Sequence, residues 1–167
     1  MTIYLIGFMG SGKSTVGIVL GERTERSYAD TDTIIETQYG SISEIFRNQG
    51  EGVFRNHESQ VLKNVSTEKE IVSTGGGIVE KEENISCMKA NGVIVHLQTS
   101  FAEIHNRLMG DSDRPLWNTD IKKKEKLFQR RNRMYQACAD ITISTDHKSP
   151  VEIASEIEVL LDQYNKE

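Results

Sequence analysis

Apolar residues along the chain form short runs that alternate with longer amphipathic stretches. The short runs are rich in β-branched residues and predict buried strands, whereas the longer stretches show helical spacing of their apolar residues. The predicted strands cover residues 3–6, 28–29, 71–73, 93–97 and 141–144. The predicted helices cover residues 13–25, 43–49, 53–64, 80–90, 101–108, 122–138 and 150–164. This alternation predicts an α/β fold with a parallel sheet covered by helices on both faces.

The length and organisation of the chain indicate one domain. The 167 residues contain no internal repeat, no low-complexity segment and no linker. A chain of this size buries about two thirds of its unfolded surface around one core. We therefore expect a single domain over residues 1–167. The polar stretch 109–124, which contains "GDSDRPLWNTD", is the least regular part, and we interpret it as a mobile lid.

Composition and charge argue against several classes of protein. The net charge of −5 and the pI near 5.5 disfavour a general nucleic-acid binder, which needs a basic face. No signal-peptide pattern is present, and no apolar run approaches the roughly 20 residues of a membrane helix. Cys87 and Cys138 lie at neither metal nor redox spacing, which suits a reducing cytosol. We expect a cytoplasmic protein that binds neither nucleic acid nor a membrane.

The segment "GFMGSGKST" lies between the first predicted strand and the first predicted helix and matches G-x-x-x-x-G-K-[ST] from residue 7 to residue 14. Such a turn lets backbone N–H groups surround a polyphosphate at a helix N-terminus, where the helix dipole favours anions. Lys13 would reach the β- and γ-phosphates, and the Ser14 hydroxyl would join the shell of a Mg²⁺ ion. The alternative is a plain strand-to-helix turn with a solvated lysine. This alternative is much the weaker interpretation, because the spacing of the motif and its position between a strand and a helix both fit a phosphate-binding loop.

Two carboxylates in "ADTD" follow the second predicted strand. In an extended segment Asp30 and Asp32 would point to the same side. Asp30 is the better candidate for the metal, because the strand at 71–73 is not followed by the aspartate that usually holds Mg²⁺. Asp32 would accept the proton of an attacking hydroxyl. From spacing alone, it is equally plausible that Asp32 caps the helix that follows.

Two arginines lie on the apolar faces of predicted helices. Arg55 stands three residues before Glu58, and spacing alone favours a structural ion pair between them. Arg131 occupies the inner stripe of its helix beside Tyr135, whereas Arg130 and Arg133 are expected to be solvated. An inward guanidinium suits the recognition of a carboxylate or phosphate, but an arginine snorkelling along the core edge fits this pattern equally well.

Three further features remain ambiguous from the residues alone. Arg114 in "DRPLW" would close over the γ-phosphate, or it is an ordinary loop residue. Glycines 75–77 follow a buried strand and permit either close approach to a ligand or a tight turn. The four histidines show no metal-ligand spacing, and we assign them no role.

The ordered motifs together resemble the shikimate kinase family. They are "GFMGSGKST", "DTD", "GEGVFRNHE", "TGGG", "RPLW", the spacing of Arg131 and Tyr135, and "TDHKSP". The resemblance covers nearly the whole chain. It implies a P-loop fold like that of nucleoside monophosphate kinases, with three layers and a five-stranded parallel sheet. It also implies a substrate-binding region at about 31–62, a lid at about 109–124, and a monomer.

The resemblance further implies a reaction, in which ATP phosphorylates the 3-hydroxyl of shikimate with Mg²⁺ as cofactor, and a role for each matching residue. Asp32 would contact the shikimate hydroxyls and act as base, with Lys13 and Arg114 completing the catalytic set. The implied ATP-binding residues are Gly10, Ser11, Gly12, Lys13, Ser14, Thr15, Arg107, Arg114 and Lys148. The implied shikimate-binding residues are Asp32, Arg55, Gly76, Gly77 and Arg131. Ser14 and, through water, Asp30 would hold the metal. Lys148 stands where the family often has an arginine, which puts its stacking contribution in question.

Two rival functions can be separated from this one by experiment. A kinase for another small molecule, such as gluconate, would not need two arginines aimed at a carboxylate in this order along the chain. A non-catalytic nucleotide-binding regulator would bind ATP without acceptor-dependent ADP release, but the intact "GSGKS" and "DTD" argue against it.

Overall fold

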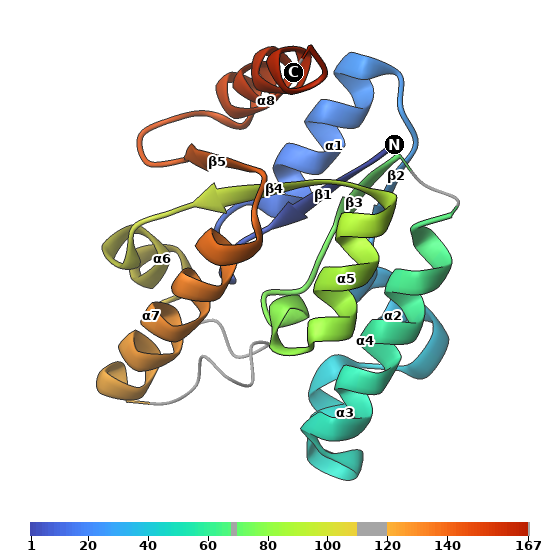
Figure 1. Cartoon of the computed structure of the whole chain (residues 1–167). Coiled ribbons are helices and arrows are strands. Elements are labelled where there is room, and N and C mark those ends of the chain that lie inside the picture. The colour runs from blue at the N-terminus through green and yellow to red at the C-terminus, as the bar shows by residue number, and fades with distance from the viewer. Residues whose placement is uncertain (68–69, 110–119, 167) are drawn as a thin grey trace.

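The computed structural model describes residues 1–67, 70–109 and 120–166, and its centre is a parallel β-sheet (Figure 1). The strand order is β2-β3-β1-β4-β5, and every pairing is parallel. The strands are β1 (Thr2–Ile6), β2 (Tyr28–Asp30), β3 (Ile71–Ser73), β4 (Gly92–Gln98) and β5 (Ile141–Ser144). The five parallel strands that the sequence predicts are therefore confirmed, each within one residue at either end.

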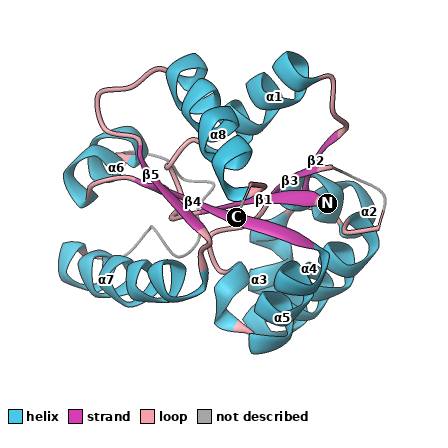
Figure 2. Cartoon of the chain, turned by 45° about the horizontal axis from the view of Figure 1, so that its top comes forward, coloured by secondary structure: helices cyan, strands magenta, loops and turns pink. Residues whose placement is uncertain are grey.

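The helices connect successive strands and cover both faces of the sheet (Figure 2). They are α1 (Lys13–Thr24), α2 (Thr31–Tyr39), α3 (Ile42–Gln49), α4 (Glu51–Val65), the 3₁₀ turn η1 (Ile78–Glu80), α5 (Glu82–Asn91), α6 (Phe101–Leu108), α7 (Ile121–Cys138) and α8 (Pro150–Tyr164). Successive side chains of β1 point to opposite faces of the sheet, and each face packs against its own layer of helices. Ile3 and Leu5 join the core under α1 and α8, whereas Tyr4 and Ile6 join the core on the side of α4 and α5.

Several helix boundaries differ from the predicted ones for local reasons. The predicted helix 80–90 begins only at Glu82, because η1 follows the three glycines first. The segment after β2 is helical from Thr31, and its cap is Asp30, whose Oδ1 accepts hydrogen bonds from the backbone N–H groups of Asp32 and Thr33. The alternative in which Asp32 caps this helix is therefore wrong. At α8, Ser149 and Glu152 form a reciprocal capping box beside Pro150.

The connection from β2 to β3 is long and contains α2, α3 and α4, which lie together at one side of the molecule (Figure 1). Most of the predicted lid, residues 110–119, lies outside the described residues. Residues 121–124 belong to the first turn of α7. Among the described residues, no helix is both long and apolar enough to cross a membrane.

Candidate active site

A cavity of about 720 Å³ opens where β1, β2 and β3 end, which is where parallel α/β sheets commonly bind ligands. It brings together groups that are far apart in the sequence. The lining residues include Gly10, Ser11, Gly12, Lys13, Ser14, Thr15, Asp30, Asp32, Arg55, Glu58, Gly75, Gly76, Gly77, Arg107, Arg131 and Lys148. Every described residue among the sequence-predicted site residues is in this set. Arg114 lies outside the described residues.

The glycine-rich loop between β1 and α1 forms one end of the cavity. Gly10 and Gly12 adopt positive φ angles of 81° and 89°, which non-glycine residues rarely adopt, and α1 begins directly after Gly12. The N-cap residue of this helix, Gly12, has no side chain to cap it, so the N–H groups of the first turn suit an anion. The Lys13 ammonium lies inside the loop and donates to the carbonyl oxygens of Gly7 (2.8 Å) and Phe8 (3.1 Å).

The oxygen atoms of Ser14 and Asp30 lie next to this loop. The Ser14 hydroxyl donates to Oδ2 of Asp30 at 2.5 Å, while Oδ1 of Asp30 caps α2. A hydroxyl and a carboxylate oxygen beside a phosphate site are ligands that Mg²⁺ accepts, because this ion commonly uses one or two protein oxygens together with phosphate and water. No cluster of three or more acidic, histidine or cysteine side chains that could form a separate metal cage occurs among the described residues.

Asp32 reaches the cavity from a helix, not from the extended segment that the sequence analysis assumed. It lies in the first turn of α2, so the expected geometry of two carboxylates on one side of a strand is wrong. A Cβ atom placed on Gly75 would lie 2.8 Å from Oδ1 of Asp32 and 2.7 Å from Oε2 of Glu58. Two carboxylates from different helices therefore converge on the glycine that opens the second loop.

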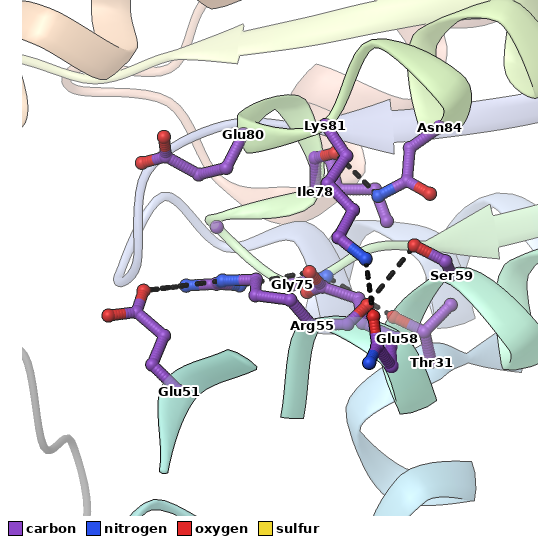
Figure 3. Close-up of polar contacts among 12 residues, drawn as sticks. Thr31, Glu51, Arg55, Glu58, Ser59, Gly75, Ile78, Glu80, Lys81 and Asn84 are labelled. Atoms are coloured by element: carbon purple, nitrogen blue, oxygen red, sulfur yellow. Dashed lines mark hydrogen bonds and ion pairs between the residues drawn. The ribbon is translucent and has the colours of Figure 1, made fainter. Parts of the chain in front are cut away.

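Arg55 is held between two carboxylates of its own helix (Figure 3). Its Nη1 donates to Glu58 at 2.9 Å, and its Nη2 donates to Glu51 at 3.1 Å. Glu58 is fully buried, and burial raises the pKa of its carboxyl group although the charge of Arg55 opposes this shift. The ion pair that spacing favoured is present, and Arg55 also lines the cavity. The structural ion pair is thus confirmed, and the binding of a ligand by Arg55 stays a prediction that its place in the cavity wall permits.

Arg131 is one of the largest fully buried side chains and enters the cavity from α7. Its Nε donates to Oε1 of Glu80 at 2.9 Å. Arg130 was expected to be solvated, and it is exposed, but its Nη2 donates to the same Glu80 oxygen at 2.7 Å. Tyr135, one turn after Arg131, donates its hydroxyl to the carbonyl oxygen of Gly76 and so connects α7 to the glycine loop.

Comparison with known proteins agrees with this geometry. The family model described as "Shikimate kinase" matches residues 9–162. The chain belongs to the shikimate kinase family. The shikimate kinase of Persephonella marina is 44% identical over 157 residues, covering 93% of this chain and 95% of the relative. A solved structure of shikimate kinase from Acinetobacter baumannii in complex with shikimate has a TM-score of 0.93 and 34% identity, covering 98% of this chain and 93% of that one.

A second solved shikimate kinase, from Aquifex aeolicus, has a TM-score of 0.86 and 35% identity and covers 99% of this chain and 98% of its own. A gluconokinase from Sinorhizobium meliloti shares the fold only, with a TM-score of 0.62 and 13% identity. The family resemblance expected from the motifs, with its P-loop fold and its ATP-dependent kinase activity, is therefore confirmed.

At the end of the cavity formed by the glycine-rich loop, Arg107 donates from Nη1 to the carbonyl oxygen of Gly10 at 2.9 Å. Lys148 lines the cavity, and its Nζ forms an ion pair with Glu156 at 2.6 Å. A lysine fixed in this way offers a point charge to a nucleotide and no planar surface for stacking.

Sequence reasoning missed two residues beside the site. Glu80 was expected only as the start of a helix, yet it is the partner of Arg130 and Arg131. His96, to which no role was assigned, is buried on β4 against Tyr135, and burial lowers its pKa to about 4. The one local signal for Glu80 was an acidic residue three positions after the last of the glycines, whereas its distant partners gave none.

Proposed function

We propose that this cavity carries out the reaction of the shikimate kinase family with the residue roles given below. The chain transfers the γ-phosphate of ATP to the 3-hydroxyl of shikimate, giving shikimate 3-phosphate and ADP on the route to chorismate and the aromatic amino acids. One observation carries the assignment of the acceptor side: two buried arginines from different helices meet a phosphate-binding loop in a single cavity. A neutral sugar would use neither the Arg55 guanidinium nor the unpaired Nη2 of Arg131, whereas an acceptor with a carboxylate can accept hydrogen bonds from both.

The glycine-rich loop forms the proposed ATP side. Backbone N–H groups of residues 10–15 would bind the phosphates, and the Lys13 ammonium would exchange its carbonyl partners for phosphate oxygens. Arg107 and Lys148 would contact the nucleotide. Arg114, which is not among the described residues, would contact the phosphates. Ser14 and, through water, Asp30 would hold Mg²⁺, which when bound neutralises phosphate charge.

The opposite wall forms the proposed acceptor side. Arg55 and Arg131 would bind the carboxylate of shikimate, while Gly76 and Gly77 allow the ring to approach the backbone. Asp32 would contact the ring hydroxyls and accept the proton of the attacking hydroxyl. Positioning and charge neutralisation would supply most of the rate enhancement, because phosphoryl transfer requires little covalent chemistry from the protein.

We also propose that the protein acts as a monomer in the cytoplasm without nucleic acid or membrane partners. Both sides of the cavity are formed by one chain, and the net charge is −5. Light scattering coupled to size-exclusion chromatography would return the mass of one chain, 18.8 kDa. A mass of twice this value would contradict the monomer.

The reaction is tested by measuring ADP release with ATP and Mg²⁺ in the presence of shikimate, gluconate or no acceptor. We expect release that depends on shikimate alone. Release with gluconate but not shikimate would favour the kinase for another acceptor, and ATP binding without any acceptor response would favour a regulator. Omission of Mg²⁺ should abolish turnover, and turnover that persists in excess chelator would contradict the metal assignment.

A further inference from the structure

Glu80 lies at the end of η1, just behind the wall of the cavity. Its side chain is 17% exposed, and it follows the three glycines that line the cavity although it is not itself a lining residue. In Figure 3, Glu80 extends to the same side as Glu51, on the far side of Arg55 from Glu58. An acidic side chain so close to a site for an anionic acceptor weakens binding by repulsion unless its charge is compensated.

The charge of Glu80 is compensated by two arginines that share one of its oxygen atoms. Oε1 accepts from Nε of Arg131 at 2.9 Å and from Nη2 of Arg130 at 2.7 Å. The cluster of two guanidinium groups and one carboxylate keeps a net positive charge. Glu80 can therefore bind Arg131 without removing the attraction of this wall for an anion.

The contact with Glu80 divides the guanidinium group of Arg131 into an anchored side and an available side. Nε is occupied by Glu80, whereas Nη2 is buried and has no hydrogen-bond partner among the described residues. Nη1 lies 3.6 Å from the position that a Cβ atom on Gly76 would occupy, which places it at the glycine loop. A buried guanidinium with unpaired N–H groups facing a cavity is suited to a carboxylate from a ligand.

We propose that Glu80 is a positioning residue for substrate binding. It fixes Arg131 by Nε so that the two Nη groups are oriented toward the carboxylate of the acceptor before the acceptor arrives. The proposal rests on the proposed function, because it takes the acceptor to be a carboxylate held by Arg131. Pre-orientation lowers the cost of ordering a long side chain during binding, so its loss weakens acceptor binding specifically.

The test compares two variants at this position with a matched control in the same segment. Glu80→Ala removes the anchor, and Glu80→Gln keeps a neutral acceptor of the same shape. Glu83→Gln removes the charge of an exposed neighbour that pairs with Lys63 and Lys81. The KM for shikimate, the KM for ATP, kcat and the melting temperature are measured for all of them.

We expect Glu80→Ala to raise the KM for shikimate about tenfold, the loss corresponding to one charged hydrogen bond, with the KM for ATP within twofold of wild type. Glu80→Gln should raise the KM for shikimate about threefold, and Glu83→Gln should change neither constant. If Glu80→Ala fails to fold, the threefold effect of Glu80→Gln decides the question.

Three outcomes would overturn the proposal. Shikimate KM values within twofold of wild type in the folded Glu80 variants would make Glu80 a structural ion pair only, even if the melting temperature falls. Equal increases in both KM values would indicate general damage. If wild type releases no ADP with shikimate, the proposed function fails together with this proposal, whereas an active wild type with unaffected variants overturns the role of Glu80 alone.

Discussion

Replacement of Gly77 by alanine tests how closely the glycine loop packs against Arg55. Gly77 has a φ angle of −95°, which any residue adopts, so the added methyl group acts through sterics alone. A Cβ atom there would overlap the Arg55 guanidinium group. The guanidinium must then leave its place between Glu51 and Glu58, and with it the proposed contact to the acceptor carboxylate.

The size of the effect follows from the interactions that Arg55 would lose. A charged hydrogen bond contributes about 1.5–3 kcal/mol, so the KM for shikimate should rise by roughly 10- to 150-fold. Complete loss of the buried pair with Glu58 would cost about 3–5 kcal/mol of unfolding free energy. We expect a smaller loss, about 1–3 kcal/mol, because the arginine is flexible and Glu58 can take up a proton.

Steady-state kinetics with both substrates and urea unfolding measure these changes. Gly52→Ala is the matched control, because a Cβ atom on this α4 residue would have no neighbour within 4 Å. It should leave both KM values unchanged and stabilise the protein by up to about 1 kcal/mol. A Gly77→Ala protein with a shikimate KM within twofold of wild type would refute the proposed contact between the Arg55 guanidinium and the acceptor.

Three other changes have separate readouts. Asp32→Asn should remove most turnover while ATP affinity, measured by calorimetry, stays nearly constant; near-normal kcat would exclude Asp32 as the base. Ser149→Ala should break the α8 capping box, costing about 1 kcal/mol and lowering Tm by about 2–4 °C, and an unchanged Tm would contradict this. His96 stays neutral in the folded state down to about pH 4, whereas the unfolded chain protonates it near pH 6.5. The free energy of unfolding should therefore fall as the pH drops through this window, by about 2 kcal/mol between pH 7 and pH 5. His96→Gln should lose this part of the pH dependence in urea unfolding, and an identical pH profile would refute it.

The features that could be predicted from the sequence depend on residues close together in the chain. The phosphate-binding loop follows from the spacing of four residues between a strand and a helix, and the Arg55–Glu58 pair lies within one helical turn. The strands were predicted almost to the residue, because buried parallel strands have nearly continuous apolar runs.

The features that could not be predicted depend on the residue at which a helix begins or on tertiary contacts. The geometry of Asp30 and Asp32 was misjudged because α2 begins between them, so that the first caps the helix that carries the second. Glu80 was missed because its partners lie about fifty residues away on α7. No periodicity within the chain reports a contact of that kind.

The most direct test of the account asks whether the acceptor is held through its carboxylate. ADP release is measured with shikimate and with shikimate methyl ester, for the wild-type protein and for Arg131→Ala. The account predicts that the ester lowers kcat/KM at least tenfold in wild type, and that Arg131→Ala weakens shikimate binding and loses most of the discrimination between acid and ester. Equal kcat/KM values for the two acceptors in wild type, or an Arg131→Ala protein with unchanged shikimate affinity and reduced stability only, would contradict the account.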